Sequence, residues 1–228
     1  MIFNASFIDY SSFFSCEYLK AGFSLKSENI NVVNDRKILA RLLGLNPEMI
    51  VIPRQKHTNN VRLVQEPGCL ENTDGIVAVN KALVLSIQVA DCIPLFLFDP
   101  VKPIIGLIHA GWRGIASEIG IKALNIFIKL GSRIEDILVL MGPCIHQCCF
   151  EVNTEVAEKF PPEFSYPSNG KYFLDITAAM KEQLVRIGIL NRHLEIADEC
   201  TCCDTEHFFS YRREGERAGR MVAIFGWM

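Results

Sequence analysis

Three side chains with metal-binding chemistry stand at the ends of apolar, strand-like runs. They are His57 in Arg54-Gln55-Lys56-His57, Cys92 in Ala90-Asp91-Cys92, and His109 at the start of His109-Ala110-Gly111-Trp112-Arg113-Gly114. Each one lies where a buried segment gives way to turn residues, so the fold can bring the three together at one edge of a sheet. Two imidazoles and one thiolate leave a fourth position for water or substrate, which is the composition of a catalytic rather than a structural zinc site. The sequence therefore predicts one metal centre made of His57, Cys92 and His109.

The same residues also admit a plainer interpretation. Any one of them, taken alone, is an ordinary half-buried residue at a strand end, and their wide separation fits no compact zinc-finger pattern. A cysteine hydrolase is a further alternative, with Cys92 as the thiolate nucleophile and His109 as its base. Metal content separates the two enzymes, because a thiolate bound to zinc is unavailable for acyl chemistry. A non-catalytic binding module would keep the pocket and show no turnover.

A glycine-containing turn follows His109 and precedes a predicted helix. Gly111 and Gly114 let the backbone approach a ligand closely, and the helix start offers free N–H groups and a positive dipole end. Arg113 between them adds a bidentate donor suited to phosphate. The turn therefore predicts an anion site, although the two glycines also fit a tight strand-to-helix connection that binds nothing.

Further charged residues are candidates for the same pocket. Asp74 in Thr73-Asp74-Gly75 is either a turn residue or a polar group of the pocket. Arg212, Arg213 and Arg220 lie close in sequence to Phe208-Phe209-Ser210. These arginines either gather at the cleft to hold an anion or form a solvated cluster of charges.

The chain contains nine cysteines, an odd and high number. In a reducing compartment such cysteines are more often free, metal-bound or catalytic than paired in disulfides. Apart from Cys92, most of them fall into two clusters, Cys144/Cys148/Cys149 and Cys200/Cys202/Cys203. The spacings within these clusters differ from those of zinc knuckles, so the sequence favours small buried thiols over a second metal.

Apolar runs separated by turn residues predict a mixed α/β fold. Strands are predicted at Met49–Pro53, Val61–Gln65, Gly75–Val79, Leu83–Val89, Leu95–Phe98, Ile104–His109, Ile137–Met141, Leu194–Ala197 and Met221–Phe225. Helices are predicted from an Asn34-Asp35 cap to Gly44, and at Ile115–Leu130, Thr154–Phe160 and Ile176–Ile187. Several strands are apolar on both faces, which is typical of strands covered on both sides. The Pro161–Gly170 stretch is loop-like but too short to be a linker, so we expect a single mixed α/β domain over residues 1–228.

Composition excludes several classes of protein. The 23 basic and 26 acidic residues give a net charge of −3, and no basic stripe is present, so nucleic-acid binding is not expected. The first residues, Met1–Cys16, lack the charged and apolar regions of a signal peptide. No apolar run approaches the roughly 20 residues that a membrane helix needs. We therefore expect a cytoplasmic protein that binds neither nucleic acid nor membrane.

Five short strings, in this order along the chain, strongly resemble one family. They are Arg-Gln-x-His, Ala-Asp-Cys-x-Pro, His-Ala-Gly-Trp-Arg-Gly, Gly-Pro-Cys-Ile and Phe-Phe-Ser-Tyr-Arg-Arg. The family is the laccase-domain family, once described as multicopper polyphenol oxidases and now regarded as zinc-dependent purine nucleoside phosphorylases. The likeness runs from about Gly22 to the C-terminus. It implies that His57, Cys92 and His109 hold the metal, and that the fold is an α/β/β/α sandwich of the Cys–His hydrolase-like type.

The resemblance also implies phosphorolysis of adenosine, inosine and S-methyl-5′-thioadenosine, together with adenosine deamination. The cofactor would be zinc, one per chain, with copper also possible because the same ligands accept both metals. Purine nucleoside and phosphate would be the binding partners. Phosphate would be held by the glycine turn and Arg113, with Arg54 or Arg213, and Asp74 is a candidate to protonate the departing base. Two departures stand out, since His146 and Phe150 occupy positions where the family often has Gly and Tyr.

A copper-dependent polyphenol oxidase is the alternative that the older description of the family suggests. Such an enzyme needs a trinuclear copper cluster with many histidine ligands, whereas this chain has five histidines and no His-x-His. Copper oxidation would therefore have to use a single site. The zinc deaminase signature H-x-E…P-C-x-x-C is missing too, because His109 is followed by Ala110 and Gly111. Any deamination must use a different arrangement of residues.

Overall fold

Two large β-sheets form the centre of the structure, a computed structural model that describes residues 2–3, 6–26 and 32–228. The first sheet has seven strands. In spatial order they are β1 (Ile2–Phe3), β2 (Phe7–Asp9), β3 (Leu19–Ser24), β16 (Met221–Trp227), β8 (Val84–Val89), β4 (Ile50–Pro53) and β6 (Gly68–Leu70). Strand β8 pairs antiparallel with β16 and parallel with β4, so the sheet is mixed.

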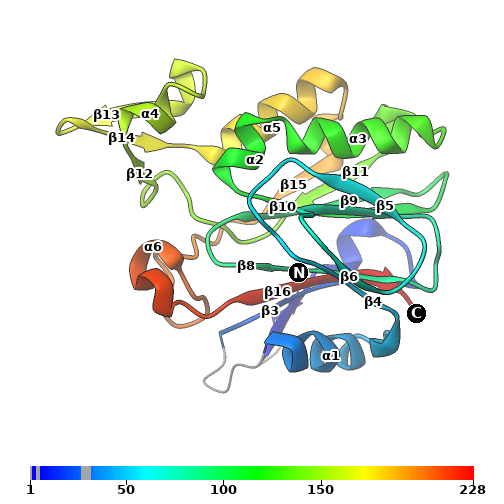
Figure 1. The fold of residues 1–228 in the computed structure, drawn as a ribbon. Coiled ribbons are helices and arrows are strands. Elements are labelled where there is room, and N and C mark those ends of the chain that lie inside the picture. Colours follow the sequence, from blue (N-terminus) through cyan, green and yellow to red (C-terminus); the bar gives the residue numbers. More distant parts are fainter. Residues whose placement is uncertain (1, 4–5, 27–31) are drawn as a thin grey trace.

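The second large sheet has six strands and is also mixed. Its order is β15 (Leu194–Ile196), β11 (Leu138–Met141), β9 (Ile93–Asp99), β10 (Ile104–Ala110), β7 (Gly75–Ala78) and β5 (Val61–Val64). A small third sheet consists of β12 (Glu151–Val152), β14 (Lys171–Leu174) and β13 (Ser165–Ser168). Figure 1 shows this small sheet projecting at one end of the molecule, beyond the edges of the two large sheets.

Helices cover the outer faces of the two large sheets (Figure 1). Helix α1 (Val32–Leu42) covers the first sheet, and α2 (Trp112–Ala116), α3 (Ile119–Lys129) and α5 (Ile176–Ile187) cover the second (Figure 1). Helix α4 (Thr154–Ala157) lies beside the small sheet, and α6 (Tyr211–Glu214) lies at the same end of the molecule (Figure 1). Leu39 of α1 shares a buried cluster with Ile224 of the first sheet, and Phe127 of α3 shares another with Leu97 of the second sheet. The resulting order of layers, α/β/β/α, confirms the expected sandwich.

Large apolar side chains fill the space between the two sheets. The buried cluster there contains Phe23 and Phe225 of the first sheet together with Phe96 and Leu107 of the second. Every residue of β9 and β10 is buried. Continuous apolar runs therefore mark strands that are covered on both faces, as their sequences predict.

The helix predicted over Ile115–Leu130 is wrong as a single element. The backbone N–H of Ser117 donates to the carbonyls of Arg113 and Gly114, and Glu118 takes a left-handed conformation with φ of 58°. The chain therefore turns between α2 and α3. Helix α5 holds this turn, since Arg186 pairs with the Glu118 carboxylate at 3.0 Å and the Gln183 amide donates to the Ile115 carbonyl at 3.0 Å.

Other boundaries also differ from the sequence patterns. Helix α1 begins at Val32, so Asn34 and Asp35 lie inside it rather than before it, whereas its predicted end at Gly44 is confirmed by a φ of 76° there. Helix α4 ends at Ala157, several residues before the predicted end. The stretch predicted as a loop at 161–170 contains β13, which pairs with β14. The sequence patterns also miss six further strands, namely β1 to β3, β6, β12 and β14.

No helix among the described residues has both the length and the apolar character that a bilayer span requires.

Candidate metal centre and its pocket

Two turns and the end of a strand bring His57, Cys92 and His109 together. His57 follows β4, Cys92 lies between β8 and β9, and His109 is the penultimate residue of β10. One ligand atom from each of the three side chains lies within 4.8 Å of the other two. The rings of His57 and His109 meet edge to face, with centroids 4.8 Å apart. The three residues singled out by their sequence context therefore share one site in the structure.

Gly111 leaves room beside these ligands. Its φ of −78° is one that any residue adopts, so conformational freedom does not explain the glycine. A Cβ atom at this position would lie 2.9 Å from the Cys92 sulfur and 3.2 Å from Cδ2 of His57. Any side chain here would therefore intrude between two of the ligands. The donor set and the space beside it fit a soft or borderline metal ion, zinc or copper.

Asp74 holds two of the ligands in place. Its carboxylate is fully buried and accepts hydrogen bonds from the backbone N–H groups of Lys56, His57 and Thr58 and from the Thr58 hydroxyl. These bonds fix the turn in which His57 has an unusual positive φ of 56°. Asp74 Oδ1 also lies 2.9 Å from Nδ1 of His109, which leaves Nε2 of that ring as the ligand atom.

The placement of Asp74 bears on the expectation that this residue protonates a departing base. Burial raises the pKa of this carboxyl group, but hydrogen bonds from His109, Thr58 and Lys56 lower it well below its usual range. Asp74 therefore stays ionised, and it does not line the pocket. A buried, ionised carboxylate in this place is suited to position His109 and the His57 turn.

The electrostatics of the centre favour one additional positive charge. Burial raises the pKa of the Cys92 thiol, but the neighbouring His109 and His57 lower it more, to about 6. Burial lowers the pKa of His109, but the charges of Cys92 and Asp74, with their hydrogen bonds, raise it to about 9. The thiolate and the carboxylate thus stabilise a proton on the imidazole, and a metal cation in the same place would gain from the same two charges.

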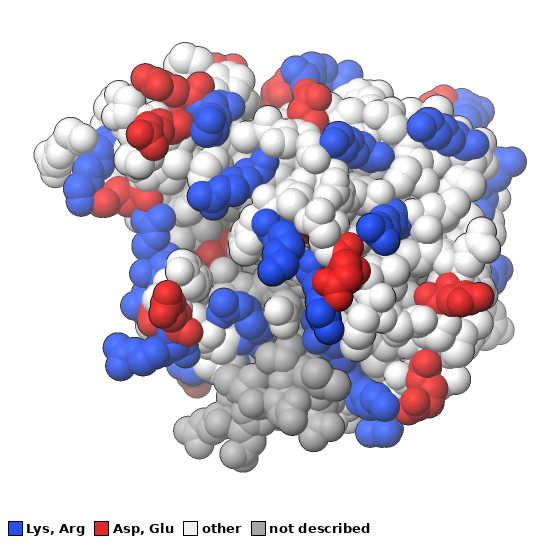
Figure 2. Space-filling model, in the orientation of Figure 1, with Lys and Arg blue, Asp and Glu red and all other residues white. Residues whose placement is uncertain are grey.

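A pocket of about 660 Å³ opens over the three ligands, a size common for small-molecule sites. Its lining includes Tyr211 and Arg212 of α6 and Phe150 just before β12 of the small sheet. Figure 1 shows these two elements at the same end of the molecule. Figure 2 shows lysine and arginine side chains along this edge. The lining residues other than the three ligands are Gln55, Gln88, Val89, Ala90, Asp91, Gly111, Trp112, Arg113, Ile145, Phe150, Ile176, Tyr211, Arg212 and Arg220.

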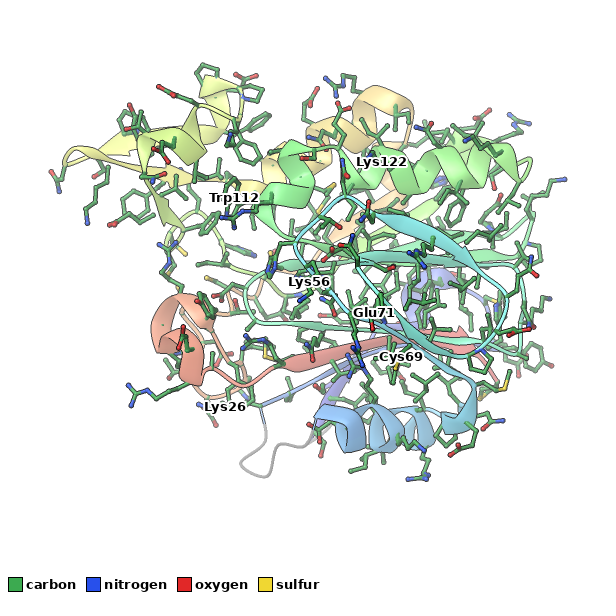
Figure 3. The ribbon with its side chains drawn as sticks, viewed as in Figure 1. Lys26, Lys56, Cys69, Glu71, Trp112 and Lys122 are labelled. Carbon is green, nitrogen blue, oxygen red and sulfur yellow. The ribbon has the colours of Figure 1, made fainter. Side chains whose placement is uncertain are left out.

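Three arginines line the pocket, each against an aromatic ring. The Arg113 guanidinium stacks over Trp112 at 4.2 Å, Arg212 over Phe150 at 5.2 Å, and Arg220 over Tyr211 at 5.9 Å from the ring centroid. Trp112 lies at the start of α2, on the side of the small sheet (Figure 3). The pocket therefore combines cationic groups with flat apolar surfaces.

The structure does not bring Arg54, Arg213 and Gly114 to this pocket. Arg54 is exposed and pairs with Glu71 at 2.8 Å. The Arg213 guanidinium donates to the carbonyl oxygens of Thr201, Cys202 and Phe208, so its donors are engaged in holding the backbone. A Cβ at Gly114 would lie 3.1 Å from the Thr58 carbonyl oxygen, so this glycine allows two backbone segments to approach each other. Among the residues predicted to bind phosphate, Arg113 and Gly111 do line the pocket.

Sequence reasoning gave no role to two groups of pocket residues. The side-chain amide of Gln55 donates to the Gln88 carbonyl at 2.7 Å and accepts from the Gln88 N–H at 2.9 Å, which ties the His57 turn to β8. The buried carboxylate of Asp91 accepts from the Thr201 hydroxyl and from the Arg212 N–H, both at 2.7 Å. Asp91 directly precedes Cys92, and Gln55 lies two residues before His57 in the quoted strings, and these positions were the available signal.

The layered fold and the Cys–His–His centre define an α/β protein with a metal-binding site. The chain belongs to the family whose model is described as multi-copper polyphenol oxidoreductase laccase, which matches residues 11–228. The resemblance noted in the sequence is thereby confirmed.

Individual relatives cover most of the chain. It is 31% identical over 229 residues to the protein named purine nucleoside phosphorylase YlmD of Geobacillus stearothermophilus, covering 91% of this chain and 83% of the relative. It is also 31% identical to the protein named adenosine deaminase RL5 from an unknown prokaryotic organism, covering 92% of this chain and 85% of the relative. The crystal structure of YlmD from Geobacillus stearothermophilus superposes with a TM-score of 0.91 at 28% identity, covering 100% of this chain and 98% of that one.

Proposed function

We propose that this protein is a zinc-dependent purine nucleoside phosphorylase that acts on adenosine, inosine and S-methyl-5′-thioadenosine and also deaminates adenosine. The observation that carries the proposal is the convergence of His57, Cys92 and His109 in a pocket lined by arginines and aromatic rings. The names of its relatives, purine nucleoside phosphorylase YlmD and adenosine deaminase RL5, support both activities. The abundance of free cysteines supports a cytoplasmic location.

The pocket offers complementary chemistry to each part of the substrates. The flat faces of Trp112 and Phe150 suit a purine ring, which binds proteins by stacking. Arg113, Arg212 and Arg220 suit the phosphate dianion, because a guanidinium donates two parallel hydrogen bonds to such an oxyanion. The ligand trio lines the same pocket as these groups.

Phosphorolysis exchanges one bond for another. A phosphate oxygen forms a bond to C1′ of the ribose while the bond from C1′ to the purine nitrogen breaks. The electron pair of the broken bond stays with the purine, which takes up the proton that hydrogen phosphate gives up. The products are the free base and ribose 1-phosphate, and the arginines contribute by holding phosphate in line with C1′.

The chain's own residues prepare the centre for zinc. His57, Cys92 and His109 would hold the ion, and Asp74 fixes the tautomer of His109 and the turn of His57. Zinc supplies a Lewis acid in the wall of the pocket when it is bound. Copper is the other metal that this donor set accepts, and metal analysis of protein purified without added metal decides between them.

Chromatography of the products with and without phosphate tests the proposal. The expected result is adenine and ribose 1-phosphate from adenosine only when phosphate is present. Deamination should give inosine without phosphate, and with phosphate that inosine should be converted further to hypoxanthine and ribose 1-phosphate. A hydrolase would instead release free ribose without phosphate. Zinc-loaded protein that leaves all three nucleosides unchanged in phosphate buffer contradicts the proposal.

Replacing His57 by alanine tests the role of the metal. The variant removes one of three protein ligands, so we expect it to lose both bound metal and turnover. Full activity in His57→Ala would rule out the zinc mechanism. A cysteine hydrolase using Cys92 and His109 is the alternative, and metal-free protein with activity on acyl substrates would favour it.

A further inference from the structure

Four cysteine sulfurs meet at a second place, outside the pocket. Cys148 and Cys149 lie in the segment after β11, and Cys200 and Cys203 lie in the segment after β15. The Sγ atoms of all four lie within 4.8 Å of one another. Cys148 is 3.7 Å from Cys200 and 3.5 Å from Cys203, and Cys149 is 3.3 Å from Cys203. We refer to these four residues as the four-cysteine cluster.

The distances in the four-cysteine cluster match a metal site better than disulfides. Zinc–sulfur bonds of about 2.3 Å in a regular tetrahedron place neighbouring sulfurs about 3.8 Å apart. A disulfide needs two sulfurs about 2.05 Å apart. The three short S···S distances are close to the tetrahedral edge, and the remaining pairs lie near enough to complete it. From this geometry we propose that Cys148, Cys149, Cys200 and Cys203 bind a structural zinc ion.

Parallel strand pairing explains how the two segments meet. Strands β11 and β15 run parallel, so the chain leaves both at the same edge of the sheet. The pairing continues beyond the strands as a bridge between Cys144 and Cys200, where the Thr201 N–H donates to the Cys144 carbonyl at 2.9 Å. Each segment then contributes two sulfurs, from Cys148 and Cys149 on one side and from Cys200 and Cys203 on the other. The pairing of the two strands therefore brings the four sulfurs together. The spacing of the cysteines within one segment does not decide whether they form a site.

The surroundings of the cluster also favour a bound cation. The backbone N–H of His146 points at the Cys200 sulfur, at 3.4 Å, and N–H donors of this kind stabilise metal-bound thiolates. Cys200 is buried, Cys149 is half-buried, and Cys148 and Cys203 are exposed. Zinc would therefore lie at the surface with all four positions taken by thiolates. Such a closed site is structural, because no position is left for a substrate.

The proposed zinc would fix one wall of the active-site pocket. The segment that bears Cys148 and Cys149 also supplies Ile145 and Phe150 to the pocket lining. The segment that bears Cys200 and Cys203 contains Thr201, whose hydroxyl donates to Asp91 and whose carbonyl accepts from Arg213. Joining the two segments through four metal–sulfur bonds would hold these groups in one arrangement.

The test measures the zinc content of a variant in which the centre of His57, Cys92 and His109 is disabled. We call this variant the background. The double variant His57→Ala/His109→Ala removes two of three ligands there, so any zinc that remains belongs elsewhere. We expect about two zinc ions per chain in the unmodified protein and about one in this background. Adding Cys203→Ser should remove the remaining ion, and so should Cys148→Ser. Two separate serine variants are used so that loss of zinc can be measured even where one of them fails to fold.

Two cysteines provide matched controls. Cys202 is the immediate neighbour of Cys203 but is not part of the four-cysteine cluster. Cys69 is exposed on β6, an edge strand of the first sheet, whereas the four-cysteine cluster follows β11 and β15 of the second sheet. In the same background, Cys202→Ala and Cys69→Ser should each retain about one zinc ion.

Cobalt absorption spectroscopy and a mass measurement that detects disulfides add independent readouts. Cobalt bound in the background variant should show strong near-ultraviolet charge transfer from several thiolates, whereas the first centre contributes one thiolate. Two results together support the proposal, whether or not the protein acts on nucleosides. The background variant keeps one zinc ion, and adding Cys203→Ser removes both that ion and the cobalt absorption. Three results would overturn the proposal: a background variant without zinc, zinc unaffected by both serine variants, or a disulfide between cluster cysteines in protein purified without oxygen.

Discussion

Asp74 and His109 are joined twice, through backbone and side chain. The His109 N–H donates to the Asp74 carbonyl at 2.7 Å, and the Asp74 carboxylate lies 2.9 Å from His109 Nδ1. Both residues are buried, and they sit where β7 and β10 lie side by side. Because the same carboxylate also holds the His57 turn, two ligands of the centre depend on one side chain.

Replacing Asp74 by asparagine should weaken metal binding by about 10–100-fold, because the amide presents N–H donors to groups that are themselves donors. Zinc affinity measured by competition with a chelator gives the result. Thr58→Val is the graded control, since it removes one hydrogen bond to Asp74 and leaves the carboxylate in place. Unchanged zinc affinity in Asp74→Asn would show that the carboxylate does not orient the ligands.

Gly111→Ala should abolish metal binding while leaving the protein folded. The added Cβ would lie 2.9 Å from the Cys92 sulfur, whereas the backbone conformation at this position suits alanine. Metal content and circular dichroism together give the measurement. The control is Gly120→Ala in α3, where the added Cβ would meet the flexible end of the Met180 side chain from α5, and this variant should keep its metal. A Gly111→Ala protein with normal metal content would contradict the account of the space beside the ligands.

Arg113→Gln should raise the KM for phosphate by about 10–100-fold, which corresponds to the loss of a charge-assisted hydrogen bond worth about 1.5–3 kcal/mol. The KM for the nucleoside should change much less. Arg54→Gln is the control, because Arg54 pairs with exposed Glu71 outside the pocket and its loss should leave both constants unchanged. The reverse pattern would restore Arg54 as the phosphate ligand.

Phe225→Ala should lower the free energy of unfolding by about 3–5 kcal/mol, as large-to-small changes in a core do. Phe225 is fully buried between the two sheets and contacts Phe14 and Phe96, with ring centroids 4.8 Å and 5.4 Å away. Urea denaturation gives the value. Tyr18→Ala, at a side chain that is 60% exposed, should cost much less. Equal losses in the two variants would argue against this core.

Local sequence patterns predict the parts of the fold that are set by burial. Strands β9 and β10 were recognisable because both of their faces are covered, and α5 because its apolar residues repeat at helical spacing. The break between α2 and α3 was not, since it depends on the contacts of Glu118 and Ile115 with α5. No local pattern marks a left-handed glutamate.

The residues of the candidate site were also predictable only where local sequence decides their role. His57, Cys92 and His109 were identifiable because ligand chemistry belongs to individual residues. The roles of Asp74 and Arg213 were not, because a carboxylate or a guanidinium in a sequence gives no sign of whether it faces a pocket or the backbone. The four-cysteine cluster was dismissed on spacing within each segment, whereas the pairing of β11 with β15 brings the two segments together. A single domain over residues 1–228 stays a prediction.

Strand β16 lies between β3 and β8 in the middle of the first sheet, although it follows every other strand in the sequence (Figure 1). During translation the two halves of that sheet therefore wait for residues 221–227 to leave the ribosome before they can join. Until then the apolar faces that flank the missing strand are open to other unfolded chains, which is the condition under which aggregation competes with folding. A ribosome stalled before this strand would hold a chain whose first sheet is split in two and whose core is still open.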